Sequence, residues 1–125
     1  MDKKHNILFV DDEKSSADAV KAMLESLGYR VTARTSSIEA LEAFKNDPDR
    51  FDLVVTDMTM PNMTGKELAG EVMAIRSSMP IILCTGYSEQ IKKEEAEAMG
   101  IRAFLMKPII AQDMAKTIRE VLDSE

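Results

Sequence analysis

The feature that most constrains the fold is a regular alternation of short strand-like runs with longer segments of helical periodicity, repeated five times along the 125 residues. The strand-like runs are residues 7–10, 29–35, 53–56, 81–84 and 103–106. Between and after them, apolar residues recur every three or four positions, which is typical of helices with one buried face. Five β/α units in strict alternation predict an α/β fold in which helices cover both faces of a parallel sheet.

The order of the strands follows from their polarity. Four of the runs are apolar or, at residues 53–56, apolar up to a final Thr56, as strands covered on both faces require. Residues 29–35 instead alternate polar and apolar side chains, which predicts an edge strand with one wet face. The expected arrangement is therefore a doubly wound five-stranded sheet of order 2-1-3-4-5. This order also puts the strand at residues 103–106 at an edge, although that run is entirely apolar.

The expected helices are residues 15–27, residues 88–99, residues 110–123 and two more that begin near Ser36 and Thr64. Three of the helix starts resemble a capping box, in which a Ser or Thr precedes an acidic residue by three positions. These pairs are Ser15 with Asp18, Ser36 with Glu39, and Thr64 with Glu67. Gly28 is the expected stop of the first helix.

Composition limits the classes of function. The net charge of -6 disfavours nucleic acid and anionic membrane surfaces as direct partners. The apolar run after the charged N-terminus is too short for a signal peptide or a membrane span. Cys84 is the only cysteine, which favours a reducing compartment. We expect a single cytoplasmic domain over residues 1–125.

Polar residues follow the strands at the ends where a parallel sheet binds its ligands. Asp11 and Asp12 follow the first strand, Asp57 follows the third, Thr85 the fourth and Lys107 the fifth. In a sheet of this order the first and third strands are neighbours, so the three carboxylates should meet in one crevice at the switch point.

Three carboxylates at close range repel one another, so either one takes up a proton or a cation binds. Oxygen ligands favour a hard cation, Mg²⁺ first, with Mn²⁺ or Ca²⁺ as alternatives. Lys107 adds a positive charge and Thr85 a hydroxyl donor. A carboxylate nucleophile, a metal, an ammonium and a hydroxyl are the groups that phosphoryl transfer requires.

These residues resemble the receiver domain of two-component response regulators over essentially the whole chain. The matching motifs are Asp11-Asp12, Asp57-Met58-Thr59-Met60-Pro61 with Gly65, Thr85-Gly86 and Lys107-Pro108. The resemblance implies the flavodoxin-like receiver fold and phosphorylation of Asp57. It also implies direct Mg²⁺ ligation by Asp12 and Asp57, ligation by the backbone carbonyl of Thr59, and a contribution of Asp11 through water.

The same resemblance implies that Thr85 and Lys107 bind the phosphoryl group and that Phe104 is the switch aromatic. The phosphodonor would be a phosphohistidine on a histidine kinase or a histidine phosphotransfer domain. The switch would remodel the face made by the helix at residues 88–99, the strand at residues 103–106 and the helix at residues 110–123, and the resemblance allows dimerisation on phosphorylation. The resemblance also implies a phosphoacceptor switch that is not a turnover enzyme and has only intrinsic Mg²⁺-dependent autophosphorylation and autodephosphorylation. The resemblance further implies a cis peptide between Lys107 and Pro108, and residues 85–88 and 107–109 look like receivers of hybrid sensor kinases.

Two other functions use parts of the same set. A haloacid-dehalogenase-like phosphatase also has an Asp nucleophile, Mg²⁺ and a Lys, but it needs a second Asp where this chain has Thr59. A flavodoxin-like FMN carrier needs a phosphate-binding loop after the first strand, where Asp11-Asp12-Glu13 would repel the phosphate.

The remaining singular residues have simpler interpretations. His5, the only histidine, lies in a charged N-terminal arm and is expected to be solvated. Cys84 is expected to be buried without a redox function. Three methionines near Asp57 fall outside the core periodicity and are expected to line a partner surface: Met58, Met60 and Met63.

Overall fold

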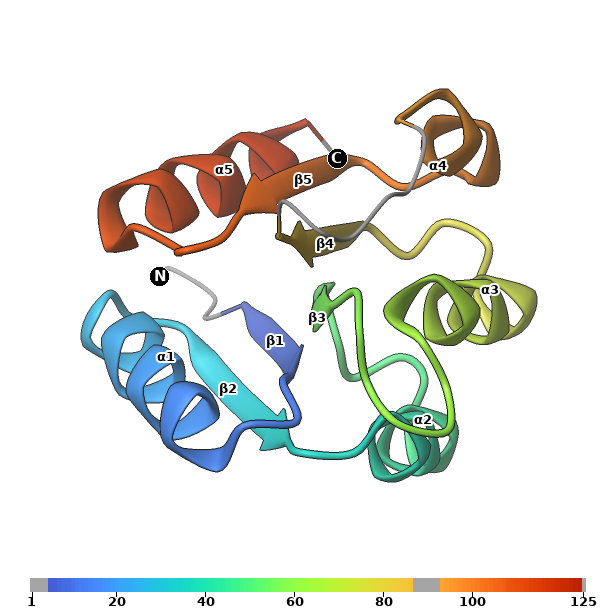
Figure 1. Cartoon of the computed structure of the whole chain (residues 1–125), viewed down its shortest axis with the longest axis horizontal. Helices are drawn as coiled ribbons and strands as arrows, with labels where there is room; N and C mark the ends of the chain where they lie inside the picture. Colours follow the sequence, from blue (N-terminus) through green and yellow to red (C-terminus); the bar gives the residue numbers. More distant parts are fainter. Residues whose placement is uncertain (1–4, 87–92, 125) are drawn as a thin grey trace.

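A computed structural model describes residues 5–86 and 93–124, which form a three-layer α/β sandwich (Figure 1). The strands are β1 (Asn6–Val10), β2 (Arg30–Arg34), β3 (Leu53–Asp57), β4 (Ile81–Thr85) and β5 (Ala103–Met106). The helices are α1 (Lys14–Ser26), α2 (Ser37–Asn46), α3 (Gly65–Ile75), α4 (Lys93–Met99) and α5 (Ala111–Asp123). The expected start of α4 at Ser88 lies outside the described residues. The alternation in the sequence thus gives the element order observed.

All strand pairs are parallel, and the sheet order is β2-β1-β3-β4-β5, which confirms the predicted doubly wound arrangement. The register pairs Val10 with Thr56 and Asp57 with Cys84. The carboxyl ends of β1, β3 and β4 are therefore level with one another at one edge of the sheet.

Two apolar layers hold the helices against the sheet. One face packs against α1 and α5, with Phe9, Val55, Leu24 and Ile118 among its buried residues. The opposite face packs against α2, α3 and α4, with Leu8, Val54, Phe44, Leu68 and Ala96 among its buried residues. Neighbouring residues of each strand alternate between these layers, which is why the central strands are mostly apolar and carry their polar residues mainly at their ends.

Both predicted edge strands are edges. In β2, Val31 is buried whereas Arg30 is exposed. In β5 only Leu105 is buried, so its apolar composition is compatible with an edge position.

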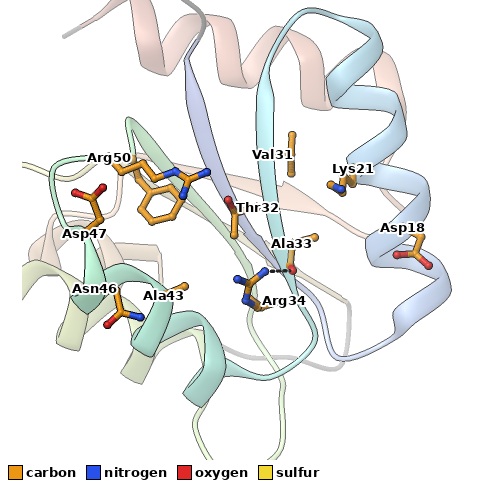
Figure 2. Close-up of a pocket in the computed structure, with 11 residues that line it drawn as sticks. Asp18, Lys21, Val31, Thr32, Ala33, Arg34, Ala43, Asn46, Asp47 and Arg50 are labelled. Atoms are coloured by element: carbon orange, nitrogen blue, oxygen red, sulfur yellow. Dashed lines mark hydrogen bonds between the residues drawn. The ribbon is translucent and has the colours of Figure 1, made fainter.

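Beside β2 a groove of about 430 Å³ runs between α1 and α2 (Figure 2). There the Arg34 guanidinium donates to the Ala33 carbonyl at 2.9 Å. This hydrogen bond satisfies one backbone carbonyl at the open edge of the sheet.

Two of the three predicted caps are confirmed. The Ser36 side chain accepts from the Glu39 amide at the start of α2, and Thr64 and Glu67 form a complete capping box at α3. The prediction for Ser15 was wrong, because α1 begins at Lys14 with Glu13 as its N-cap and no side-chain cap bond. Ser15 is already inside the first turn. The stop at Gly28 agrees with its left-handed backbone, at φ +101°.

The structure also decides the interpretation of several single residues. His5 is exposed and Cys84 is buried, as expected. The partner-surface prediction was wrong for Met60, which is buried in the α2/α3/α4 layer, while Met58 and Met63 pack against the same layer. The loop after Asp57 folds back onto the core and takes Met60 with it. Within the described ranges no helix is long and apolar enough to cross a membrane.

Candidate functional site

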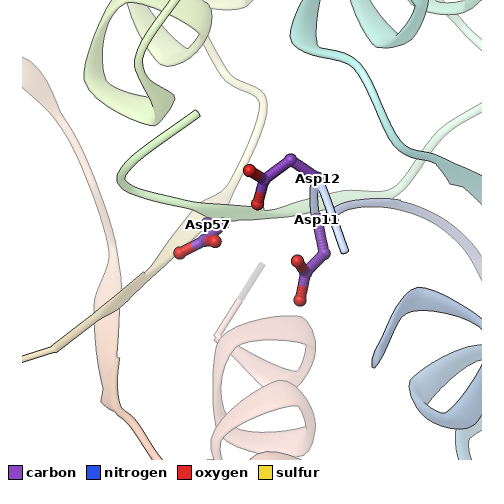
Figure 3. Close-up of side chains that lie close together, drawn as sticks. All are labelled: Asp11, Asp12 and Asp57. Atoms are coloured by element: carbon purple, nitrogen blue, oxygen red, sulfur yellow. The ribbon is translucent and has the colours of Figure 1, made fainter. Parts of the chain in front are cut away.

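Three carboxylates meet at the carboxyl ends of β1 and β3. Asp11 and Asp12 directly follow β1, and Asp57 is the last residue of β3. Figure 3 shows the three side chains gathered around one space, and one oxygen of each lies within 4.8 Å of one oxygen of the others. This is the crevice that the sequence predicted, and it arises because β1 and β3 are neighbours in register.

The acidic group is largely buried. Asp11 and Asp57 are 6% and 4% exposed, whereas Asp12 is open to solvent. The two oxygens of Asp11 are held by the α1 region, one by the Glu13 amide at 3.0 Å and the other by the Ser16 hydroxyl at 2.8 Å. Asp11 is therefore fixed by local hydrogen bonds, while Asp12 is exposed and faces water.

Lys107 supplies the positive charge predicted for the site. Its ammonium lies 2.6 Å from Oδ1 of Asp57. The Lys107 amide donates to the Thr85 carbonyl at 2.7 Å, which ties the end of β5 to the end of β4. The peptide bond between Lys107 and Pro108 is cis, as expected. A buried carboxylate needs a charged partner, and Lys107 is that partner here.

The backbone of Asp57 is fixed by close packing from α3. The Met58 amide donates to the Cys84 carbonyl at 2.9 Å, and the Gly65 amide donates to the Met58 carbonyl at 2.7 Å. A Cβ atom at Gly65 would overlap the carbonyl oxygen of Asp57 and lie 3.0 Å from its carbonyl carbon. Glycine at this position lets the start of α3 approach the end of β3.

A cleft of about 430 Å³ leads from the surface to Asp57. Its polar wall includes Asp11, Asp12, Ser16 and Lys107. Its remaining wall is mainly apolar and comes from α1 and from the segment between β5 and α5: Ala19, Val20, Pro108 and Ile109. The groove beside β2 has a similar volume but contains none of the predicted site residues.

Thr85 and Phe104 lie on the other face of the sheet from Lys107 and Asp57. Cys84 and Leu105 belong to the α1/α5 layer, so Thr85, next to Cys84, and Phe104, next to Leu105, point to the α4 side. Phe104 packs against the apolar layer formed with α2, α3 and α4. The Thr85 hydroxyl donates to Sδ of Met106 at 3.4 Å, and Thr85 is not among the residues that line the cleft.

Three residues of the site were given no role from the sequence. Ser16 holds Asp11, Gly65 makes room for Asp57, and Met106 accepts from Thr85. The signal for Ser16 was its place one helical turn after the acidic pair. Gly65 belongs to the receiver motif that follows Asp57, but the motif alone does not show what it contacts. Nothing in the sequence distinguishes Met106 from the other methionines.

The donor set fits a hard divalent cation. Asp11, Asp12 and Asp57 offer only oxygen, two of the three are buried, and the ammonium of Lys107 does not balance three carboxylates. Thr59 follows Asp57 by two residues in an exposed part of the loop, and its carbonyl as a ligand stays a prediction. When bound, such an ion would neutralise negative charge on the oxygens of a phosphoryl group during its transfer.

Comparison with known proteins decides the family. Residues 7–119 match the family described as the response regulator receiver domain. The chain belongs to the receiver-domain family. The transcriptional regulatory protein ZraR of Klebsiella oxytoca is 33% identical over 94% of this chain and 26% of its own length. The sensor kinase CckA of Brucella abortus is 31% identical over 95% of this chain and 13% of its own length.

A solved structure agrees with the family assignment. A response regulator receiver domain protein from Clostridium thermocellum superposes with a TM-score of 0.91 at 32% identity, covering 96% of this chain and 95% of that one. This receiver domain spans only a small part of the two curated relatives named above. The family is a signalling switch of two-component systems, which supports the receiver interpretation over the phosphatase and the flavin carrier.

Proposed function

We propose that Asp57 is the phosphoacceptor of this receiver and takes its phosphoryl group from a phosphohistidine. One carboxylate oxygen of Asp57 forms the new P–O bond while the P–N bond of the donor breaks. The imidazole nitrogen keeps the electron pair and takes a proton from solvent. The observation that carries the proposal is the burial of Asp57 at the base of an acidic cleft with the Lys107 ammonium at 2.6 Å. Lys107 is placed to offset charge that gathers on the phosphoryl oxygens.

The chemistry is tested with phosphoramidate, a small donor that carries a P–N bond. In the presence of Mg²⁺ we expect the protein to gain one phosphoryl group, and we expect chelation of the metal to prevent it. Hydroxylamine should remove the group, because it cleaves acyl phosphates and leaves phosphoserine and phosphothreonine intact. A hydroxylamine-resistant product, or loading that ignores the chelator, would contradict the proposal.

We propose that Asp12 and Asp57 ligate Mg²⁺ directly, with Asp11 acting through water and the Thr59 carbonyl completing the protein ligands. The proposal is supported by the closeness of the three carboxylates and by the exposure of Asp12. Mg²⁺ keeps several waters in most protein sites, so weak binding at an open cleft suits it.

Mg²⁺ should stabilise the fold, and Asp12→Asn should abolish the effect. At ten times its Kd, Mg²⁺ adds about 1.4 kcal/mol to the free energy of unfolding. For a chain of this size that is a rise of roughly 5 °C in Tm. Asp12→Asn should lose this rise and, without metal, be at least as stable as the parent, because one repelling carboxylate is gone. Asp49→Asn, at an exposed acid away from the cleft, is the control. An unchanged Mg²⁺ response in Asp12→Asn, measured by calorimetry, would refute the site.

We propose a histidine kinase or histidine phosphotransfer domain as the donor partner. The cleft supports this, because Ala19, Val20 and Ile109 provide an apolar rim around the acidic base, and Ile110 beside it is exposed. A donor helix could bury such a rim while its histidine reaches Asp57. We further propose that residues 1–125 act as one domain in the cytoplasm, without direct contact to nucleic acid or membrane.

We also propose that phosphorylation remodels the α4/β5/α5 face through Thr85 and Phe104, and that this face can then support dimerisation. The phosphoryl group brings roughly -1.5 to -2 charges and strong acceptor oxygens beside β4. Thr85 is the last residue of β4, one step beyond the residue paired with Asp57, so a small shift brings its hydroxyl within reach. Phe104, only half-buried, can fill the space that Thr85 leaves.

The expected result of Thr85→Ala is phosphorylation without a full switch. Amide exchange with and without beryllofluoride should change most over residues 86–106 in the parent protein, and this response should fall by at least half in Thr85→Ala. The alanine variant keeps Asp57, Lys107 and the acidic pair, so it should still accept a phosphoryl group. A parent response centred on residues 15–45 would contradict the assignment of the switch.

A further inference from the structure

The hydroxyl of Thr85 already has a partner in the structure, and that partner is on the neighbouring strand. Thr85 pairs in register with Met106 of β5, and its Oγ1 donates to Sδ of Met106 at 3.4 Å. Thr85 is 6% exposed whereas Met106 is 54% exposed. A hydroxyl has one proton to donate, so a bond to Met106 and a bond to any other acceptor exclude each other.

Alternation along the strands explains the contact. Phe104 and Met106 lie two residues apart and point to the same side of β5, the side to which Thr85 points on β4. Lys107, the next residue, points to the opposite side, where it meets Asp57. The end of β5 therefore carries one contact for the acidic cleft and, on its other face, one contact for the Thr85 hydroxyl.

We propose that Met106 is a positioning residue that holds the Thr85 hydroxyl in the unphosphorylated state and sets how readily the switch responds. This inference rests on the proposed role of Thr85 as a phosphoryl ligand. A thioether is a weak acceptor. It satisfies the hydroxyl of the nearly buried Thr85. Phosphoryl oxygens are much stronger acceptors, so they would replace the thioether as the partner of this hydrogen bond.

The energetic consequence is a competition between two states. The apparent affinity of the protein for a phosphoryl group or its mimic decreases as the fraction of molecules in which Met106 holds the Thr85 hydroxyl increases. Leucine is close to methionine in volume and offers no acceptor, so Met106→Leu removes the competing bond with little repacking. Since Met106 is half exposed at a sheet edge, the substitution should leave the core intact.

The test measures Mg²⁺-dependent binding of beryllofluoride by titration. Met106→Leu should bind about two- to fivefold more tightly than the parent, the range expected when a weak hydrogen bond is lost from the unbound state. In a Thr85→Ala background the same substitution should have no effect, because no hydroxyl remains to be released. Met73→Leu, a half-buried methionine on α3, controls for the general effect of the exchange.

A spectroscopic readout separates a hydrogen bond from a packing effect. The ε-methyl resonance of Met106 should shift when beryllofluoride binds the parent protein, and the shift should be much smaller in Thr85→Ala. Equal affinities for Met106→Leu and the parent, with binding at Asp57 intact, would overturn this inference alone. No binding by the parent would overturn the proposed function as well, so the two failures are distinguishable.

Discussion

Gly65→Ala is expected to destabilise the fold by about 2–3 kcal/mol, because the added Cβ overlaps the main chain of Asp57. The clashing atom is the carbonyl oxygen of Asp57, which is backbone in a central strand, so no flexible side chain can move aside. Either the start of α3 or the end of β3 must shift. A displaced Asp57 carboxylate should also slow phosphorylation, since positioning dominates this chemistry.

The matched control lies one and a half turns along the same helix. A Cβ at Gly70 would meet only the Met99 side chain at 3.9 Å, an ordinary contact. Gly70→Ala should therefore stabilise the protein by roughly 0.5–1 kcal/mol, as expected for glycine to alanine inside a helix. Urea unfolding of both variants measures the difference. A Gly65→Ala protein as stable as the parent would show that the close approach of α3 to Asp57 does not contribute to the free energy of unfolding.

Lys107→Ala is expected to slow phosphorylation by roughly 10²–10³-fold, the usual cost of removing one charged or polar group aimed at a developing oxyanion. In the structure the ammonium is 2.6 Å from a nearly buried carboxylate. The same variant should bind Mg²⁺ more tightly, because Asp57 no longer shares its charge with an ammonium. Rate and metal affinity therefore move in opposite directions.

That opposition distinguishes a role in the reaction from a role in folding. A merely destabilised site would lose both the rate and the metal. Lys116→Ala, at an exposed lysine on α5, is the control and should change neither. Stopped-flow loading with phosphoramidate gives the rate, and a metal titration of the unphosphorylated protein gives the affinity. A Lys107→Ala protein that loads at the parent rate would remove Lys107 from the mechanism.

The parts of this receiver that could be predicted from sequence are those fixed by local pattern and by topology. Polarity marked β2 as an edge strand, and the strand order then brought Asp11 and Asp57 together, because neighbouring parallel strands end at the same edge. The caps at Ser36 and Thr64 were also predictable, since a cap depends on residues three positions apart.

The errors arose where tertiary contacts override local pattern. Ser15 had the sequence of a cap, but the helix begins one residue earlier, where Asp11 accepts the Glu13 amide. Met60 lies in a loop, yet the loop packs on the core and buries it. The contact between Thr85 and Met106 joins two strands in register, and neither residue carries a local signal for it.

The assignment of Asp57 as the phosphoacceptor is tested most directly by the intact mass of three proteins after treatment with phosphoramidate and Mg²⁺. The parent and the surface control Asp49→Asn should each gain one phosphoryl group. Asp57→Asn should gain none, although its amide fits the same space beside Lys107. A hydroxylamine-sensitive phosphoryl group on Asp57→Asn, gained at the parent rate, would contradict the assignment.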